Sequence, residues 1–137
     1  IPIKLHINTN GGEVYKVLSI ISYIKKIPYK VHTICEGCVA SAGVLLSMAG
    51  DKRYMYENAY MLVHEIRSGM WGKYSECIDD MYNNKKIMKD IKKYFTTQSN
   101  EKFGEEQMEK ILKRDILLKA KKCLKYGLID KIITFEE

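Results

Sequence analysis

Hydrophobic and polar positions follow two different periods in the first part of this chain. Residues 3–7 (Ile-Lys-Leu-His-Ile) alternate with a period of two, which predicts a strand that ends in the turn at residues 8–12. Apolar residues then recur at helical spacing, at Val14, Val17, Leu18, Ile21 and Ile24. The pattern therefore predicts a strand, a Gly-Gly turn and a helix, in this order.

The rest of the chain continues this alternation. We expect strands over residues 29–35, ending at Gly37, over 53–56 and over 60–64, and a short apolar helix over 40–49 that stops at Gly50. A long amphipathic helix is expected over about residues 73–97, followed by helices over 105–112 and 120–126. Strands that alternate with helices indicate parallel βα units, so the expected fold class is α/β.

Length and composition limit the class of protein. A chain of 137 residues has room for one domain, expected over 1–137. Its 46% hydrophobic and 29% charged residues exclude collagen-like and disordered classes, and no apolar run suits a membrane helix. The net charge of +6 would suit nucleic acid, but the lysines are spread over helical segments, which is more typical of solvated helix faces. We therefore expect neither a membrane nor a nucleic-acid partner.

Four scattered cysteines indicate a reducing compartment rather than a secreted disulfide scaffold. Cys35 and Cys38 have the CxxC spacing of zinc and redox sites, but no second Cys/His pair stands at ligand spacing. Buried thiols are thus the better interpretation, and no metal or other cofactor is expected. Because the chain starts at Ile1 rather than Met, we expect a fragment or a processed form.

Two short segments could carry chemistry. Asn10-Gly11-Gly12 lies between a strand and a helix, so its backbone N–H groups could hold an anion in a cleft, although Gly-Gly is usually only a turn. Ser41 lies among small residues at the start of a helix. It could be a helix N-cap, a buried small residue or a nucleophile, and on this segment alone the N-cap is favoured.

A nucleophilic serine needs a base, a group that orients the base, and N–H donors for the oxyanion. Of the three histidines, His6 and His32 lie within expected strands, whereas His64 ends one and could reach a cleft. A satisfied surface or core histidine is an equally common reading of His64.

Asp115 is the candidate orienting group. It follows a helix and precedes the apolar residues 116–118, so its carboxylate could stand at the edge of a buried segment. The alternative is a surface acid paired with a lysine or with Arg114.

Five segments resemble, in order, the signature segments of the ClpP family, the proteolytic subunits of the Clp protease. They are Ile7-Asn8-Thr9-Asn10-Gly11-Gly12, Gly37-Cys38-Val39-Ala40-Ser41-Ala42-Gly43, Met61-Leu62-Val63-His64, Arg114-Asp115 and Tyr126-Gly127-Leu128-Ile129-Asp130. The resemblance runs over nearly the whole chain. It implies the ClpP/crotonase-like α/β fold of repeated β-β-α units with a long handle helix, and the N-terminal part of that fold is expected to be absent here.

The resemblance also implies roles for five residues. Ser41 would be the nucleophile, His64 the general base and then acid, and Asp115 the residue that orients His64. The amides of Gly12 and Ala42 would form the oxyanion hole. The function implied is a serine endopeptidase that cleaves unfolded polypeptides.

An extended substrate would add as a strand between two segments of the chain. The resemblance implies these substrate-binding residues: Glu13, Val14, Ser68, Gly69, Met70 and Trp71. Two departures from the family pattern lie near them, because the usual Pro is Asn10 and the usual Gln-Pro after the histidine is Glu65-Ile66.

The partners implied are further copies of the chain, in two stacked heptameric rings, and an AAA+ unfoldase of the Clp family. The expected compartment is the cytoplasm or an organelle matrix. Two alternatives stay open. A non-catalytic ClpP-like ring subunit would usually lack one triad residue, and a crotonase-type acyl-CoA enzyme would not need Ser41, His64 and Asp115 together.

Overall fold

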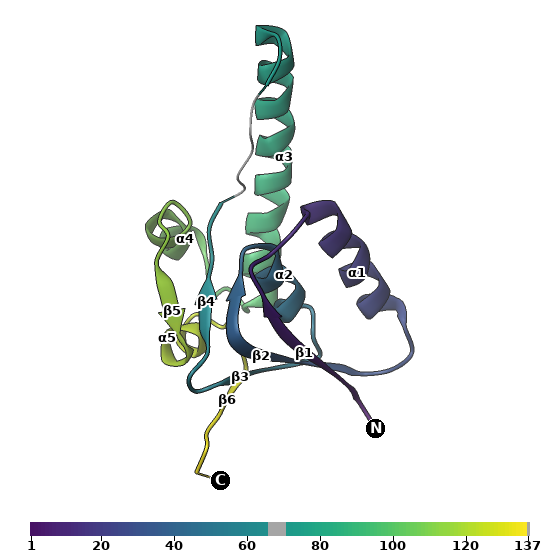
Figure 1. Cartoon of the computed structure of the whole chain (residues 1–137), viewed down its shortest axis with the longest axis vertical. Helices are drawn as coiled ribbons and strands as arrows, with labels where there is room; N and C mark the ends of the chain where they lie inside the picture. Colours follow the sequence, from purple (N-terminus) through teal and green to yellow (C-terminus); the bar gives the residue numbers. More distant parts are fainter. Residues whose placement is uncertain (66–70, 137) are drawn as a thin grey trace.

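The structure is a computed structural model, and it describes residues 1–65 and 71–136. The described strands are β1 (Ile3–Thr9), β2 (Val31–Ala40), β3 (Lys52–Tyr56), β4 (Tyr60–Leu62), β5 (Leu117–Lys119) and β6 (Lys131–Ile133). The described helices are α1 (Val14–Lys26), α2 (Ala42–Met48), α3 (Tyr74–Gln98), α4 (Glu105–Ile111) and α5 (Ala120–Lys125). The long helix α3 extends well beyond the rest of the molecule (Figure 1).

The six strands form one sheet around β2. Along one edge β2 pairs with β1 in parallel. Along the other edge its first half pairs with β3 and its second half with β4, both in parallel. Outside these, β6 pairs in parallel with β3 and β5 pairs antiparallel with β4. The mixed α/β class expected from the sequence is confirmed, with one antiparallel pair in an otherwise parallel sheet.

The strand predicted over residues 29–35 continues past Gly37 to Ala40, so the predicted stop was wrong. Gly37 has a φ of 58° and lies where the register between β1 and β2 shifts. A Cβ at Gly37 would stand 3.1 Å from the side-chain amide of Asn8, whose Oδ1 accepts a hydrogen bond from the N–H of Cys38 at 3.3 Å. The glycine therefore makes a bulge inside the strand instead of ending it.

The predicted helices are confirmed to within a few residues, and α3 is unbroken over its 25 residues. The strand expected over residues 60–64 ends at Leu62, so His64 follows it. The two short strands β5 and β6 were not expected from the sequence. Each has only three residues, too few for a periodic pattern to be recognisable.

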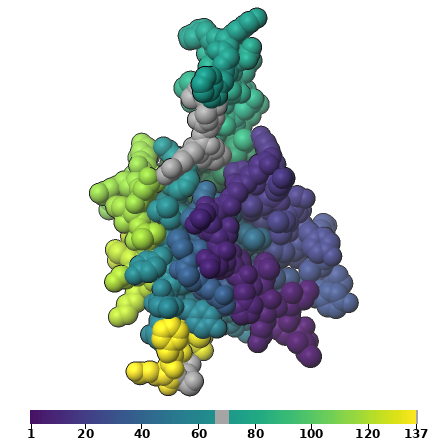
Figure 2. All heavy atoms as spheres, in the orientation of Figure 1, coloured from purple at the N-terminus to yellow at the C-terminus, as the bar shows by residue number. Residues whose placement is uncertain are grey.

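The two halves of α3 have different surroundings. In the second half, Ile91 and Phe95 are buried, Phe95 meets Phe103 edge to face at 5.4 Å, and the hydroxyl of Tyr94 donates to the carbonyl of Leu45 at 2.8 Å. In the first half, four large apolar side chains are exposed, those of Tyr74, Ile78, Met81 and Tyr82. Figure 2 shows this half of α3 standing above the body of the molecule.

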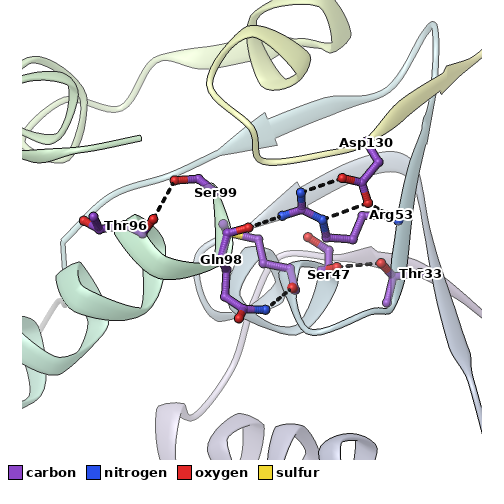
Figure 3. Close-up of polar contacts among 8 residues, drawn as sticks. Thr33, Ser47, Arg53, Thr96, Gln98, Ser99 and Asp130 are labelled. Carbon is purple, nitrogen blue, oxygen red and sulfur yellow. Dashed lines mark hydrogen bonds and ion pairs between the residues drawn. The ribbon is translucent and has the colours of Figure 1, made fainter. Parts of the chain in front are cut away.

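A buried arginine in β3 joins the end of α3 to Asp130, the residue before β6 (Figure 3). Arg53 is only 6% exposed and binds the carboxylate of Asp130 through both Nε (3.1 Å) and Nη2 (2.8 Å). Its Nη1 donates to the carbonyl of Gln98, the last residue of α3, at 3.0 Å. The fork of one guanidinium thus satisfies a carboxylate and a helix C-terminus together.

Candidate active site

Ser41 lies in a sharp turn between β2 and α2. Its backbone has φ 59° and ψ −125°, a conformation that residues other than glycine rarely adopt. It occupies the N-cap position of α2, but its hydroxyl makes no capping hydrogen bond to the described first turn of the helix. The predicted N-cap position is therefore confirmed, but the side chain does not act as a cap. Strained turns of this kind, between a strand and a helix, are a known way to expose a nucleophile.

The Gly-Gly turn packs against this serine. A Cβ at Gly11 would lie 2.8 Å from the Cβ of Ser41 and 3.4 Å from its Oγ, so only glycine allows this approach. Gly11 has a φ of 108°, and its N–H donates to the hydroxyl of Thr9 at 3.1 Å, which holds the turn on the end of β1. At Gly12, no described atom lies within 4 Å of the Cβ position. Gly12 therefore borders open space.

Ser41 and His64 line one cavity of about 470 Å³. Gly12, Ala42 and Val14 also line it, so the cavity brings together five of the residues singled out from the sequence. The connection runs through the sheet, because the N–H of Ser41 donates to the carbonyl of Leu62 at 2.8 Å and His64 follows two residues later.

The imidazole of His64 has a defined hydrogen bond. Its Nδ1 lies 2.6 Å from the carbonyl oxygen of Glu65. A carbonyl oxygen can only accept, so Nδ1 carries the hydrogen. In the neutral ring the other nitrogen, Nε2, is then free of hydrogen and can accept a proton.

Asp115 is exposed and does not belong to the described lining of the cavity. The β4–β5 ladder ends with Leu62 opposite Leu117, and His64 and Asp115 each lie two residues beyond this last pair, on adjoining segments. The N–H of Glu65 also donates to the carbonyl of Leu112 at 2.9 Å, which ties the two segments together beyond the ladder.

The predicted substrate-binding residues are less concentrated. Val14 lines the cavity, and Glu13, next to it, is exposed with an ion pair to Lys16 at 3.5 Å. Trp71 is 88% exposed and lies outside the cavity lining as the described residues define it. The remaining three predicted residues, Ser68, Gly69 and Met70, lie outside the described residues.

The cavity has further walls besides the residues to which the resemblance gives a role. Its apolar walls are Leu45 from α2, Leu62 from β4, and Ile91 and Phe95 from α3. Its polar lining includes Asn10, Cys38 and Glu65. The helical period of α3 shows that Ile91 and Phe95 share a face, but only the tertiary packing shows that this face borders Ser41.

The CxxC pair is divided between two environments. Cys35 is buried, which raises the pKa of its thiol to about 11 in spite of a hydrogen bond to Ser47, whereas Cys38 is half-buried at the cavity. Over residues 1–65 and 71–136, no three His, Cys, Asp or Glu side chains are grouped so that they could hold a metal ion.

No helix in the described part of the chain combines the length and the apolar character that a membrane crossing requires.

The comparison with known protein families agrees with this geometry. The family model of Clp protease matches residues 1–136. The matched residues include the Gly-Gly turn, the turn at Ser41, the segment of His64 and the C-terminal strands. It also agrees with the mixed α/β fold, with its curled sheet and long helix. The chain therefore belongs to the Clp protease family, a family of peptidases.

Proposed function

We propose that the chain is a serine endopeptidase in which Ser41 is the nucleophile, His64 the general base and Asp115 the residue that orients His64. The observation that carries the proposal is the turn at Ser41. A strained backbone, a hydroxyl not used as a cap, and a cavity shared with His64 and Gly12 all suit a nucleophile.

The reaction follows from these groups. Nε2 of His64 takes the proton of the Ser41 hydroxyl while Oγ attacks the carbonyl carbon of the peptide bond. The carbonyl oxygen gains negative charge, which the N–H groups of Gly12 and Ala42 would stabilise. The imidazolium then gives its proton to the leaving amine as the C–N bond breaks. Water, activated by His64 in the same way, hydrolyses the acyl-enzyme and restores the serine.

Asp115 would act on the other nitrogen of the ring. In the reactive arrangement its carboxylate accepts the Nδ1 hydrogen of His64, which now goes to the carbonyl of Glu65. The ladder of β4 and β5 supports this pairing, because His64 and Asp115 each lie two residues beyond its last pair, Leu62 opposite Leu117. A carboxylate stabilises the imidazolium better than a neutral carbonyl does, so the exchange would increase the rate.

Assembly is the second part of the proposal. The exposed apolar side chains on the first half of α3 suit a handle that packs against a second ring of subunits, and the exposed Arg114 suits the same contact. Unfolded polypeptides would then be cleaved in a closed chamber, delivered by an ATP-dependent unfoldase of the Clp family. The four free cysteines fit a reducing compartment such as the cytoplasm.

The proposal is tested with a fluorophosphonate probe and a fluorogenic peptide. Labelling of the protein at Ser41, with loss of both labelling and hydrolysis in Ser41→Ala, is the expected result, and the loss in rate should reach at least about a thousandfold. Ser22→Ala, which removes an exposed serine on α1, is the matched control and should behave like the parent. An unlabelled parent protein of native ring mass would instead identify a non-catalytic ring subunit.

A further inference from the structure

One carboxylate stands at the candidate cavity. Glu65 lines the cavity together with Ser41 and His64, and its side chain is exposed. Among the described lining residues the only other ionisable groups are Cys38 and His64, and there is no lysine or arginine. No described lysine or arginine forms an ion pair with Glu65 either. The cavity therefore carries a negative charge that the described part of the chain does not neutralise.

The backbone of Glu65 is held next to the candidate base. Its N–H donates to the carbonyl of Leu112 at 2.9 Å, and this bond does not depend on the bond from Nδ1 of His64 to the Glu65 carbonyl, which the proposed reactive arrangement gives up. It fixes the point from which the side chain leaves the backbone. The carboxylate can therefore move only within the reach of one glutamate side chain, next to the candidate base.

The remaining walls of the cavity are mainly apolar. Leu45, Ile91 and Phe95 come from two helices, and all three are buried. An apolar cavity with an anionic rim suits an amphipathic side chain that lays its methylene groups along the walls and keeps its charge at the rim. Lysine and arginine have this chemistry. A glutamate or aspartate in the substrate would meet repulsion, and an apolar side chain would gain nothing from Glu65.

We propose that Glu65 is a specificity-determining residue that selects a lysine or arginine on the acyl side of the cleaved bond. The acyl side is chosen because this residue stays attached to Ser41 in the acyl-enzyme, so its side chain must fit the cavity around the serine. The inference rests on the proposed serine-peptidase function and adds a substrate class to it.

The test uses three peptides that differ only in the residue on the acyl side of the cleaved bond. This residue is lysine, glutamate or norleucine, which has a lysine-like stem without the ammonium group. The parent protein should cleave the lysine peptide with a kcat/KM about two- to fivefold above that of the norleucine peptide, as expected for a solvated ion pair.

Glu65→Gln should reduce the ratio of kcat/KM for the lysine peptide to kcat/KM for the norleucine peptide to near one. Glu65→Lys should favour the glutamate peptide. If the substitution at residue 65 also altered His64, the kcat/KM values of all three peptides would change by the same factor. The ratios between the peptides would then stay the same. Glu65→Asp should keep part of the preference for lysine. Glu106→Gln, on the exposed face of α4, is the matched control and should leave the ratios unchanged.

The outcomes separate the two proposals. Cleavage of the norleucine peptide that depends on Ser41, without a preference for lysine, overturns the role of Glu65 alone. A preference that persists in Glu65→Gln overturns it as well. Failure to cleave any of the three peptides, together with no labelling by the fluorophosphonate probe, overturns the proposed function itself.

Discussion

The backbone N–H of Ser41 donates to the carbonyl oxygen of Leu62 at 2.8 Å, and this bond joins the candidate nucleophile to the segment that carries the candidate base. It lies one residue beyond the β2–β4 ladder, which ends with Ala40 opposite Leu62. The distance between Ser41 and His64 therefore depends on the sheet more than on side-chain packing. What can disturb the site most is a change that displaces the turn at Ser41.

Gly11→Ala is such a change. The added Cβ would stand 2.8 Å from the Cβ of Ser41, and alanine does not readily adopt a φ of 108°. Since a displacement of about 1 Å can cost about 100-fold in rate, we expect kcat/KM to fall by about 10- to 100-fold. Peptide hydrolysis measures the effect, and circular dichroism shows whether the fold is kept.

Gly104→Ala is the control for this substitution. Gly104 has a φ of −100°, and the nearest atoms to an added Cβ lie at 3.6 Å, an ordinary contact distance. This variant should keep the parent kcat/KM. Equal activity of the two alanine variants would contradict the close packing of Gly11 on Ser41.

Local patterns predicted much of this architecture. The strand, Gly-Gly turn and helix at the N-terminus, and the 25-residue helix α3, were predictable because their apolar periods extend over many residues. The cavity that joins Ser41 and His64 was anticipated through the ordered motifs. Its walls Ile91 and Phe95 were not, because no local pattern indicates which helix face borders a distant serine.

Other features depend on contacts between residues far apart in the sequence. The bulge at Gly37 is filled by the side chain of Asn8, and a glycine in isolation predicts a strand end equally well. Arg53 and Asp130 are separated by 77 residues, and in the sequence each looks like an ordinary surface charge. The three-residue strand β5 is likewise defined by the pairing it makes with β4.

Arg53→Met should destabilise the protein strongly. The substitution keeps most of the side-chain volume but removes the guanidinium donors of the Asp130 carboxylate and of the Gln98 carbonyl, and leaves Asp130 with the backbone N–H of residue 53. Breaking a buried pair costs about 3–5 kcal/mol, and we expect the lower end, about 3 kcal/mol, because Asp130 is partly solvated. Urea unfolding measures the loss. Lys52→Ala, on the exposed face of the same strand, is the control and should change stability by less than about 0.5 kcal/mol.

The same pair predicts how stability depends on pH. Burial alone would raise the pKa of Asp130, but its hydrogen bonds to Arg53 and the charge of Arg53 outweigh burial, so the pKa lies below its ordinary value. A lowered pKa stabilises the fold above the unfolded-state value of about 3.9, and this contribution is lost as the pH falls through the folded-state value.

Asp130→Asn removes this contribution. The parent protein should therefore be more stable than the variant at pH 7, and the two should converge as the pH falls below about 4. Urea midpoints measured from pH 7 to pH 2 test the prediction. A difference in stability that stays constant over this range would show that the pKa of Asp130 is the same in the folded and the unfolded state.

The four thiols should react in an order set by burial, and one of them should report on the cavity. Burial raises the pKa of Cys35 to about 11, and burial, together with the nearby Cys35 thiol, raises that of Cys123 to about 12. At pH 8 these two thiols are almost wholly protonated and should resist iodoacetamide.

The half-buried Cys38 and Cys77 should react first. Because Cys38 lines the cavity, peptide hydrolysis should fall in proportion to the fraction of Cys38 that is alkylated, which mass spectrometry measures. Cys38→Ser should keep its starting activity under the reagent, whereas Cys77→Ser should be inactivated like the parent. Full alkylation of Cys38 without loss of hydrolysis would show that substrates do not occupy the cavity beside Ser41.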